Sequence, residues 1–555
     1  MKDSLQFQEK REPLTSAGII ALLLCFVFRI PLMNIIGAEG IAYFAPVNEI
    51  LLLCIAFLNI GFAEALANMM KFRIKREQYR NAFRIYRIGY TITVVFACLA
   101  AFLILVFNNY ISEVLLAQHL SKKALLVITP AIVLMAFTCL FRGYFQGMGS
   151  PYPSAHSMIL EKVFSLTFGL LFAAFFMDYG VKAAAILRND SFALSYGAMG
   201  AALGITISSV ISFLHLFLIY LLYRGTNKRQ IYRDNTRQIE SPGFIYQSLL
   251  LTALPIGAYA VLYQVNNLID QRLFYYYFDR LNIEETIEFN RAEIWGNYYG
   301  VFIVVIGILI VLISTIFIRA SRLISSSWVR EEYRTGREQL MQTITLMLVI
   351  AVPVASLVAV LAEPIVSLFK MANNEIAVRM FQSGSVMIVF CAFNLFWIDL
   401  FKQFKRTTQM LLLAGGGLVV HIVAIIVIMP MINKTEHLIT GIIVTNIIGF
   451  GFSFFLGFFL ISRLLKYQSE WVTKNLRTFV ITLLCSAIVG LMSLFLSMGI
   501  INLVGPGLTI LICLVISVIA YLVLMTLLRG LSLNELDKIP GGFILIRLGR
   551  FIRYF

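Results

Sequence analysis

Long apolar runs separated by short polar segments make up almost the whole chain of 555 residues. A helix needs about 20 apolar residues to cross a bilayer, where its backbone groups must bond to one another. The pattern predicts fourteen transmembrane helices, which lie near residues 14–34, 46–69, 88–107, 124–141, 158–177, 196–223, 248–269, 294–318, 340–362, 379–400, 410–430, 438–462, 478–498 and 506–528. The predicted fold class is therefore an all-α polytopic membrane protein.

The composition and the charges agree with this prediction. Hydrophobic residues make up 60% of the chain and charged residues 13%, whereas a soluble protein of this length has roughly a quarter of its residues charged. Most of the 45 Lys and Arg fall in alternate polar segments, which places both termini in the cytoplasm by the positive-inside rule. Basic segments such as 71–87 are then topology signals and contacts for membrane lipids, and the net charge of +16 does not indicate nucleic-acid binding.

Motifs for bound cofactors and enzymatic chemistry are absent from the sequence. It contains no GxxxxGK[ST] phosphate loop, no HExxH and no nucleophile elbow, and its five histidines are scattered. All seven cysteines lie in apolar segments without metal-ligand spacing. We therefore expect neither an enzyme nor a cofactor or metal protein. The polar tail MKDSLQFQEKREP leads into the first helix without a small-residue cleavage site, so we expect this helix to be retained.

Weak internal similarity divides the helices into two sets of six and a final pair. LFRGYFQG, after the predicted fourth helix, and WIDLFKQF, after the tenth, both end on an aromatic and glutamine-bearing turn about 257 residues apart. An even number of helices per repeat is typical of transporters built from two parallel repeats. The predicted domains are an N-terminal lobe (1–223), a basic cytoplasmic linker (224–247), a C-terminal lobe (248–465) and two additional helices with a basic tail (466–555).

Polar residues inside the apolar segments are the candidate binding residues, since charges are costly there. Arg29 lies about fifteen residues into the first segment, beside Pro31, and could hold a phosphate, or its side chain could extend to the outer interface. Helical spacing puts an amide and carboxylate cluster on one face of the seventh helix, which suits sugar hydroxyls, an ion, or a polar seam between helices. The predicted cavity residues are Arg29, Glu49, Asn266, Asn267, Asp270 and Tyr298.

The segment CLFRGYFQGMGSPYPSAH (139–156) interrupts two apolar runs with an arginine, three glycines and two prolines. Glycines permit a tight turn and close helix approach, and the prolines set the start of the next helix. We predict a short, stiff hinge at the inner gate, formed by Arg142, Gly143, Gln146, Gly147 and Glu161. Asp399 and Lys402 are secondary candidates, which are three residues apart and could simply pair with each other.

RGYFQGMGSPYPSAHSMILEK resembles the turn between the fourth and fifth helices in the multidrug/oligosaccharidyl-lipid/polysaccharide (MOP) exporter superfamily. The similarity is to its polysaccharide transporter, stage V sporulation protein B-like and lipid II flippase-like branch. FRIPLMNIIGAEGIAYFAP, ALPIGAYAVLYQVNNLID and VLAEPIVSLF also resemble this branch, in the same order and spacing. The resemblance implies a flippase in the bacterial cytoplasmic membrane that moves undecaprenyl-pyrophosphate-linked sugars by alternating access. It also implies that Arg29 contacts the pyrophosphate and that Glu161 matches a glutamate of the fifth helix.

The chain departs from the family pattern at Met158, at Ser165 and in DLFKQFKRT, so the substrate is either a peptidoglycan precursor or a capsule or exopolysaccharide unit. Three alternatives stay open: a cation-coupled multidrug antiporter of the same superfamily, a membrane polymerase or glycosyltransferase, and a scaffold without transport activity. Glycosyltransferases or a polymerase of the same pathway would be the neighbours of a flippase.

Overall fold

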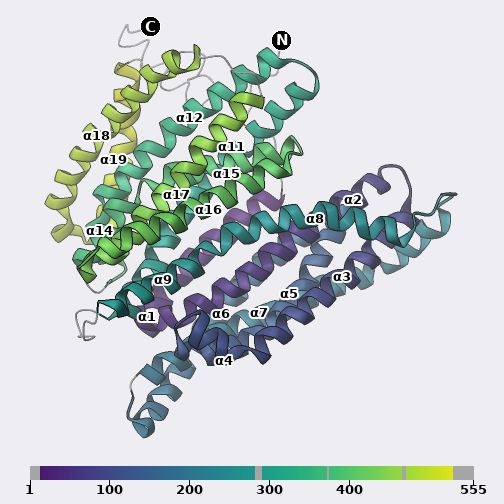
Figure 1. Ribbon diagram of the computed structural model, residues 1–555, viewed down its shortest axis with the longest axis horizontal. Coiled ribbons are helices and arrows are strands. Elements are labelled where there is room, and N and C mark those ends of the chain that lie inside the picture. The colour runs from purple at the N-terminus through teal and green to yellow at the C-terminus, as the bar shows by residue number, and fades with distance from the viewer. Residues whose placement is uncertain are drawn as a thin grey trace. The chain divides into compact units, whose positions relative to one another are not determined.

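The computed structural model describes residues 13–189, 191–281, 290–371, 374–464, 470–528 and 530. These residues form helices joined by short turns, and no strand occurs among them. They fall into two compact units, a first unit within Glu12–Val301 and a second unit within Phe302–Phe555. Figure 1 shows the helices with the labels used below. The predicted basic tail after residue 530 lies outside the described residues.

The first unit contains the helices up to α10, with η marking π and 3-10 segments. Their bounds are α1 Pro13–Ile55, η1 Ala56–Ala63, α2 Glu64–Ile74, α3 Tyr79–Val106, α4 Asn108–Tyr110, η2 Ile111–Leu115, η3 His119–Ser121, α5 Lys122–Gly147, α6 Tyr152–Leu187, α7 Ser191–Arg233, α8 Pro242–Gln264, α9 Asn266–Arg280 and α10 Arg291–Asn297. Helices α5, α6 and α7 pack side by side (Figure 1). The short π segment η4 (Tyr298–Phe302) then leads into the second unit.

The second unit contains the remaining helices. Their bounds are α11 Ile303–Val329, α12 Tyr333–Val360, α13 Ala362–Leu368, α14 Asn374–Gly384, α15 Met387–Gln403, α16 Thr407–Ile428, η5 Met429–Met431, α17 Thr435–Leu464, α18 Glu470–Val504 and α19 Pro506–Leu527. The last two helices, α18 and α19, pack against each other, and α18 packs against α12 (Figure 1). They add to the outside of the unit a pair of helices that is rich in exposed leucine and isoleucine.

The described helices cover every predicted membrane span. Twelve runs are long and apolar enough to cross a membrane, and the bent pair Glu375–Gly384 and Met387–Gln403 is a thirteenth. One of the twelve, Pro13–Ile74, is broken at Gly37, whose φ of 68° is not helical, and it covers the first two predicted segments. The described residues thus give twelve or thirteen candidate spans, close to the fourteen that the hydrophobic pattern predicts.

The two units have several turns at matching positions, about 255 residues apart. Helices α3 and α12 are both 28 residues long, and α12 starts 254 residues after α3. Left-handed residues that end helices recur at matching places. The pairs are Glu77 and Glu331, Ala117 and Lys370, and Gly149 and Lys405. The compact units divide after residue 301, whereas the predicted lobes divide in the linker 224–247. The boundaries of the lobes stay a prediction.

In the predicted linker 224–247, the first residues are helical and the middle residues contact other parts of the first unit. Helix α7 continues to Arg233, and the segment after it lies against the start of α3. The carboxylate of Asp234 accepts a hydrogen bond of 2.6 Å from the Arg80 amide, and Glu240 forms a 2.9 Å ion pair with Arg73. The Asn81 side chain donates to the carbonyl of Gln238 at 3.1 Å. These contacts fix the linker segment 234–241 to the first unit.

Candidate functional site

Arg29 is a buried cation with incomplete hydrogen bonding. Its residue is 9% exposed, and its Nη1 atom has no hydrogen-bond partner. The guanidinium lies over the ring of Phe44 at 5.6 Å and over the ring of Tyr299 at 5.3 Å. Aromatic faces attract a cation but accept no directed N–H bond, so the charge is held in place while one donor stays available. The burial of Arg29 places its side chain inside the unit.

Glu49 lies in the same helix as Arg29, beyond the break at Gly37, and interacts with it electrostatically. The Glu49 residue is 4% exposed, and its carboxylate accepts hydrogen bonds from the side chains of Gln264, Tyr299 and Asn267. The Tyr299 hydroxyl in turn accepts a 2.9 Å bond from Asn48. These residues surround one carboxylate and one arginine with neutral donors. We call Arg29, Asn48, Glu49, Gln264, Asn267 and Tyr299 the arginine site.

A π segment brings Tyr299 to this site. Tyr298 and Tyr299 begin η4, where the wider turn changes which side chains face inward. The predicted residue Tyr298 is 1% exposed and packs against Trp295 with ring centroids 5.0 Å apart. Just before it, a Cβ atom on Gly296 would lie 1.8 Å from the carbonyl oxygen of Ala38, so only glycine allows α10 to approach α1 this closely. This contact holds the tyrosines beside α1.

Asn266 and Asp270 form a second polar pair on α9. The Nδ2 atom of Asn266 lies 3.4 Å from Oδ2 of Asp270, one helical turn further along. Asp270 is fully buried. The structure thus divides the predicted cavity residues: Arg29, Glu49 and Asn267 share the arginine site, Asn266 and Asp270 contact each other, and Tyr298 packs against an indole ring.

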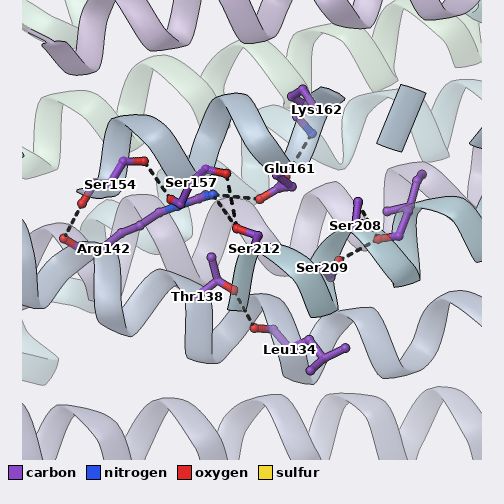
Figure 2. Close-up of polar contacts among 11 residues, drawn as sticks. Leu134, Thr138, Arg142, Ser154, Ser157, Glu161, Lys162, Ser208, Ser209 and Ser212 are labelled. Carbon is purple, nitrogen blue, oxygen red and sulfur yellow. Dashed lines mark hydrogen bonds and ion pairs between the residues drawn. The ribbon is translucent and has the colours of Figure 1, made fainter. Parts of the chain in front are cut away.

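The predicted hinge contains a buried ion pair that joins three helices. Figure 2 shows Arg142 at the centre of this network. Its Nη2 atom lies 2.9 Å from Oε2 of Glu161 on α6 and 3.4 Å from the hydroxyl of Ser212 on α7, and its Nε donates to Ser157 at 2.8 Å. Lys162 contacts the other carboxylate oxygen of Glu161 at 3.2 Å. We call Arg142, Ser157, Glu161, Lys162 and Ser212 the ion-pair network.

The turn beside the ion-pair network is as short as predicted. Helix α5 ends at Gly147, α6 begins at Tyr152, and Gly149 between them has a φ of 84°, which favours glycine. Its amide donates to the carbonyl of Gln146 at 3.1 Å. A Cβ atom on Gly143 would lie 2.7 Å from the carbonyl oxygen of Ala63, so this glycine allows close packing of α5 against the start of α2.

Asp399 and Lys402 lie on α15 in the second unit, both half-buried. The carboxylate of Asp399 accepts a hydrogen bond from the hydroxyl of Ser321 on α11. This contact ties α15 to α11. The pairing of Asp399 with Lys402 stays a prediction.

Several site residues are missing from the sequence-based prediction. Gln264 and Asn48 are uncharged, and nothing in the spacing separates them from ordinary helix-packing amides. Tyr299 was missed because the pattern does not show the π segment. Lys162 carried a usable signal, since it is a charge in the first turns of the predicted membrane helix 158–177, directly after Glu161. Among the described residues, no group of three His, Cys, Asp or Glu side chains could hold a metal ion.

Comparison with known proteins shows which of them this chain resembles. No family model matches the chain. It is 26% identical over 242 residues to stage V sporulation protein B of Bacillus subtilis (strain 168), and the alignment covers 44% of either chain. The chain thus matches less than half the length of this curated relative.

Among solved structures, the lipid II flippase MurJ in an inward closed conformation matches with a TM-score of 0.62 and 14% identity, over 93% of this chain and 98% of that one. The chain has the fold of the MOP transporter superfamily. An inward-facing multidrug resistance MATE transporter of the MOP superfamily matches with a TM-score of 0.61 and 15% identity, over 84% of this chain and 98% of that one. The first of these two structures is thus of a flippase and the second of a multidrug transporter.

Proposed function

We propose that the protein is a flippase, which moves undecaprenyl-pyrophosphate-linked sugars across the bacterial cytoplasmic membrane by alternating access. The observation that carries the proposal is the buried arginine with a spare donor, because an N–H of a guanidinium in a water-poor site binds a phosphate oxygen strongly. The likeness to stage V sporulation protein B and to the MurJ fold supports a lipid-linked substrate.

The chemistry of such a substrate explains why the site needs both a charge and neutral donors. A sugar pyrophosphate loses its hydration if it enters about 30 Å of hydrocarbon, which is prohibitively costly for its charges and hydroxyls. Arg29 would replace the water around a phosphate, and amides such as Gln264 and Asn267 would replace the water around hydroxyls. Glu49 keeps the arginine close to electrically balanced while no substrate is bound.

The test is translocation in liposomes. The purified protein is reconstituted with a fluorescent undecaprenyl-pyrophosphate sugar, and an external quencher reports which head groups have crossed. We expect the wild type to translocate and Arg29→Ala to lose most of its rate. Arg334→Ala, which removes an arginine whose side chain is 92% exposed, should match the wild type and serves as the control. A wild-type preparation that is folded but no more active than empty liposomes would refute the flippase.

A cation-coupled multidrug antiporter is the second candidate. It is favoured by the MATE likeness and by the buried carboxylate of Glu49, which could exchange a proton or sodium ion. In that case drug efflux driven by an imposed ion gradient should depend on Glu49, so Glu49→Gln would abolish it, and Arg29→Ala would leave it active. A scaffold without transport would tolerate both substitutions in both assays.

A further inference from the structure

The ion-pair network contains more positive charge than its carboxylate requires. Glu161 contacts two cations, Arg142 at 2.9 Å and Lys162 at 3.2 Å, which approach it from opposite sides (Figure 2). Arg142 and Glu161 are 7% and 6% exposed. One cation neutralises one carboxylate, so the second leaves a net charge of +1 inside a membrane-spanning unit. An unbalanced charge within a membrane-spanning helix is costly and is typical of a functional position.

The turn between α5 and α6 does not need these charges. The second unit forms the same turn between α15 and α16, with Lys405 in the left-handed conformation of Gly149. In both turns the amide of the following residue donates at 2.9 Å to the carbonyl five positions before it. Counted from the turn, Ile398 stands in the place of Arg142, and Glu161 corresponds to the glycine run 415–417. The turn can therefore form without the ion-pair network.

Lys162 lies beside the helix that carries Arg29. Seven residues after Lys162, on the same face of α6, a Cβ atom on Gly169 would lie 2.9 Å from the ring of Phe28, which directly precedes Arg29 on α1. Eight residues further along each helix, a Cβ atom on Gly197 would lie 2.6 Å from Ile36 of α1 and 3.4 Å from the sulfur of Met177 of α6, so α1 and α6 run parallel here. Seven helical residues span about 10 Å, so Lys162 lies roughly two turns before Gly169 and Arg29, on the side from which both helices begin.

We infer that Lys162 is a second contact for the diphosphate of the head group, on the side of Arg29 from which α1 begins. This inference rests on the proposed function and deepens it. The Lys162 side chain is 32% exposed and flexible, and when it turns from Glu161 to a phosphate, Arg142 still neutralises the carboxylate. Glu161 thus holds the lysine between turnovers, and a diphosphate meets one cation before the next.

Ligand binding to the full-length protein in detergent tests the inference without transport. The ligands are undecaprenyl pyrophosphate and undecaprenol, which share the tail and differ in the diphosphate. We expect Lys162→Met to weaken undecaprenyl pyrophosphate binding on the order of tenfold and to leave undecaprenol binding unchanged. Lys162→Arg should retain most of the affinity. Lys182→Met, an exposed position further along the same helix, is the matched control and should bind like the wild type.

Acylation of lysines in the wild type gives a second measurement that does not depend on how a variant folds. Undecaprenyl pyrophosphate should protect Lys162 from an amine-reactive reagent, as read by mass spectrometry, and undecaprenol should not. Unchanged affinity in Lys162→Met together with equal labelling of Lys162 with either ligand would overturn the inference. If Arg29→Ala still abolishes binding of undecaprenyl pyrophosphate in that case, the proposed flippase function stands and only the role of Lys162 is refuted. If the wild type binds both ligands equally, the proposed function itself is refuted.

Discussion

Arg29 shows at the scale of single residues how a membrane helix can keep a charge ready for use. Its guanidinium rests on two aromatic faces, which hold it electrostatically without saturating its donors. Lysine could not reproduce this arrangement, because it lacks the planar group that stacks on a ring and presents paired donors. Tyr299 does more than stack, since its hydroxyl also joins Asn48 and Glu49 to the site.

Two substitutions of Tyr299 should therefore impair transport to different degrees. Tyr299→Phe keeps the ring and loses the hydroxyl, so we expect a few-fold lower rate of translocation. Tyr299→Leu also loses the cation–π contact, which is worth about 1–2 kcal/mol when desolvated, and should lower the rate about tenfold or more. Tyr276→Leu, at a residue 50% exposed on α9, provides the control in the same liposome assay. Equal rates for Tyr299→Leu and Tyr276→Leu would show that Tyr299 does not position Arg29.

Asp234 should make the docking of the linker depend on pH. Burial alone raises the pKa of this carboxyl, but hydrogen bonds from the Arg80 amide and from Thr236 outweigh it, so the pKa lies below its usual range. The carboxylate thus stabilises the docked linker at neutral pH, and this contribution is lost only as the pH falls below about 4, through the lowered pKa.

A spin label at Ile239→Cys, with the exposed Cys98 replaced by serine, would measure this dependence. The label should be immobile at neutral pH and gain mobility in acid. Asp234→Asn should make the label mobile at every pH, because the amide is a weaker acceptor for the α3 amide. A label that keeps one mobility in both proteins over the whole range would contradict the proposed role of Asp234.

Residues that stand out by charge were predictable, and those that act through geometry were not. Arg29 and Glu49 are visible in the sequence because a charge in an apolar run is rare. The pairing of Arg142 with Glu161 was not visible, since the two lie at unequal distances from the turn and only the reach of an arginine side chain connects them. Gln264 comes to Glu49 from 215 positions away, and no local pattern records such a contact.

At the scale of elements, helices approach closely at certain glycines. The sequence shows where the glycines are, but not which of them permit close packing. Gly143 and Gly149 look alike in the hinge segment, yet Gly143 faces the backbone of Ala63 and Gly149 faces open space with a left-handed backbone. The predicted helix positions were correct, because hydrophobicity decides them. Their lengths were underestimated, since α7 and α6 continue into polar residues that favour helix as well as loop.

Gly143→Ala should destabilise the protein by about 1–3 kcal/mol, because the added methyl group meets the Ala63 carbonyl, which cannot move without shifting the backbone. Gly18→Ala is the matched control: it lies in α1 with no atom within 4 Å of the added carbon, and alanine favours helix over glycine by roughly 1 kcal/mol. Thermal unfolding in detergent should therefore show a lower midpoint for the first and an equal or higher one for the second. The opposite order would contradict the packing described for α5.

At the scale of the whole molecule, the repeat is clearer in the backbone than in the side chains. Helices α3 and α12 have equal length, whereas the arginine and glutamate of the ion-pair network have no counterparts after α15. A duplicated chain keeps its turns because they set the direction of each helix, and its charges can diverge because each copy meets a different demand. This explains why a sequence comparison finds only a weak repeat.

The hydrophobic pattern predicts an even number of spans, and the distribution of Lys and Arg predicts that both ends of the chain lie in the cytoplasm. We therefore predict that green fluorescent protein fused after the last residue is fluorescent in bacterial cells, since it folds only inside. Alkaline phosphatase at the same place should be inactive. Active phosphatase with dark fluorescent protein would reverse the orientation and require an odd number of spans.

The left-handed residues that end helices have a practical consequence. Glu77, Glu331, Lys370 and Lys405 are exposed and hold a backbone conformation that costs a residue with a side chain about 1 kcal/mol, and glycine much less. Nature has placed glycine at only one of the six matching positions. Glycine at the other exposed positions should give a more heat-resistant protein for purification and imaging. It relieves backbone strain at the turns between helices and changes no buried charge.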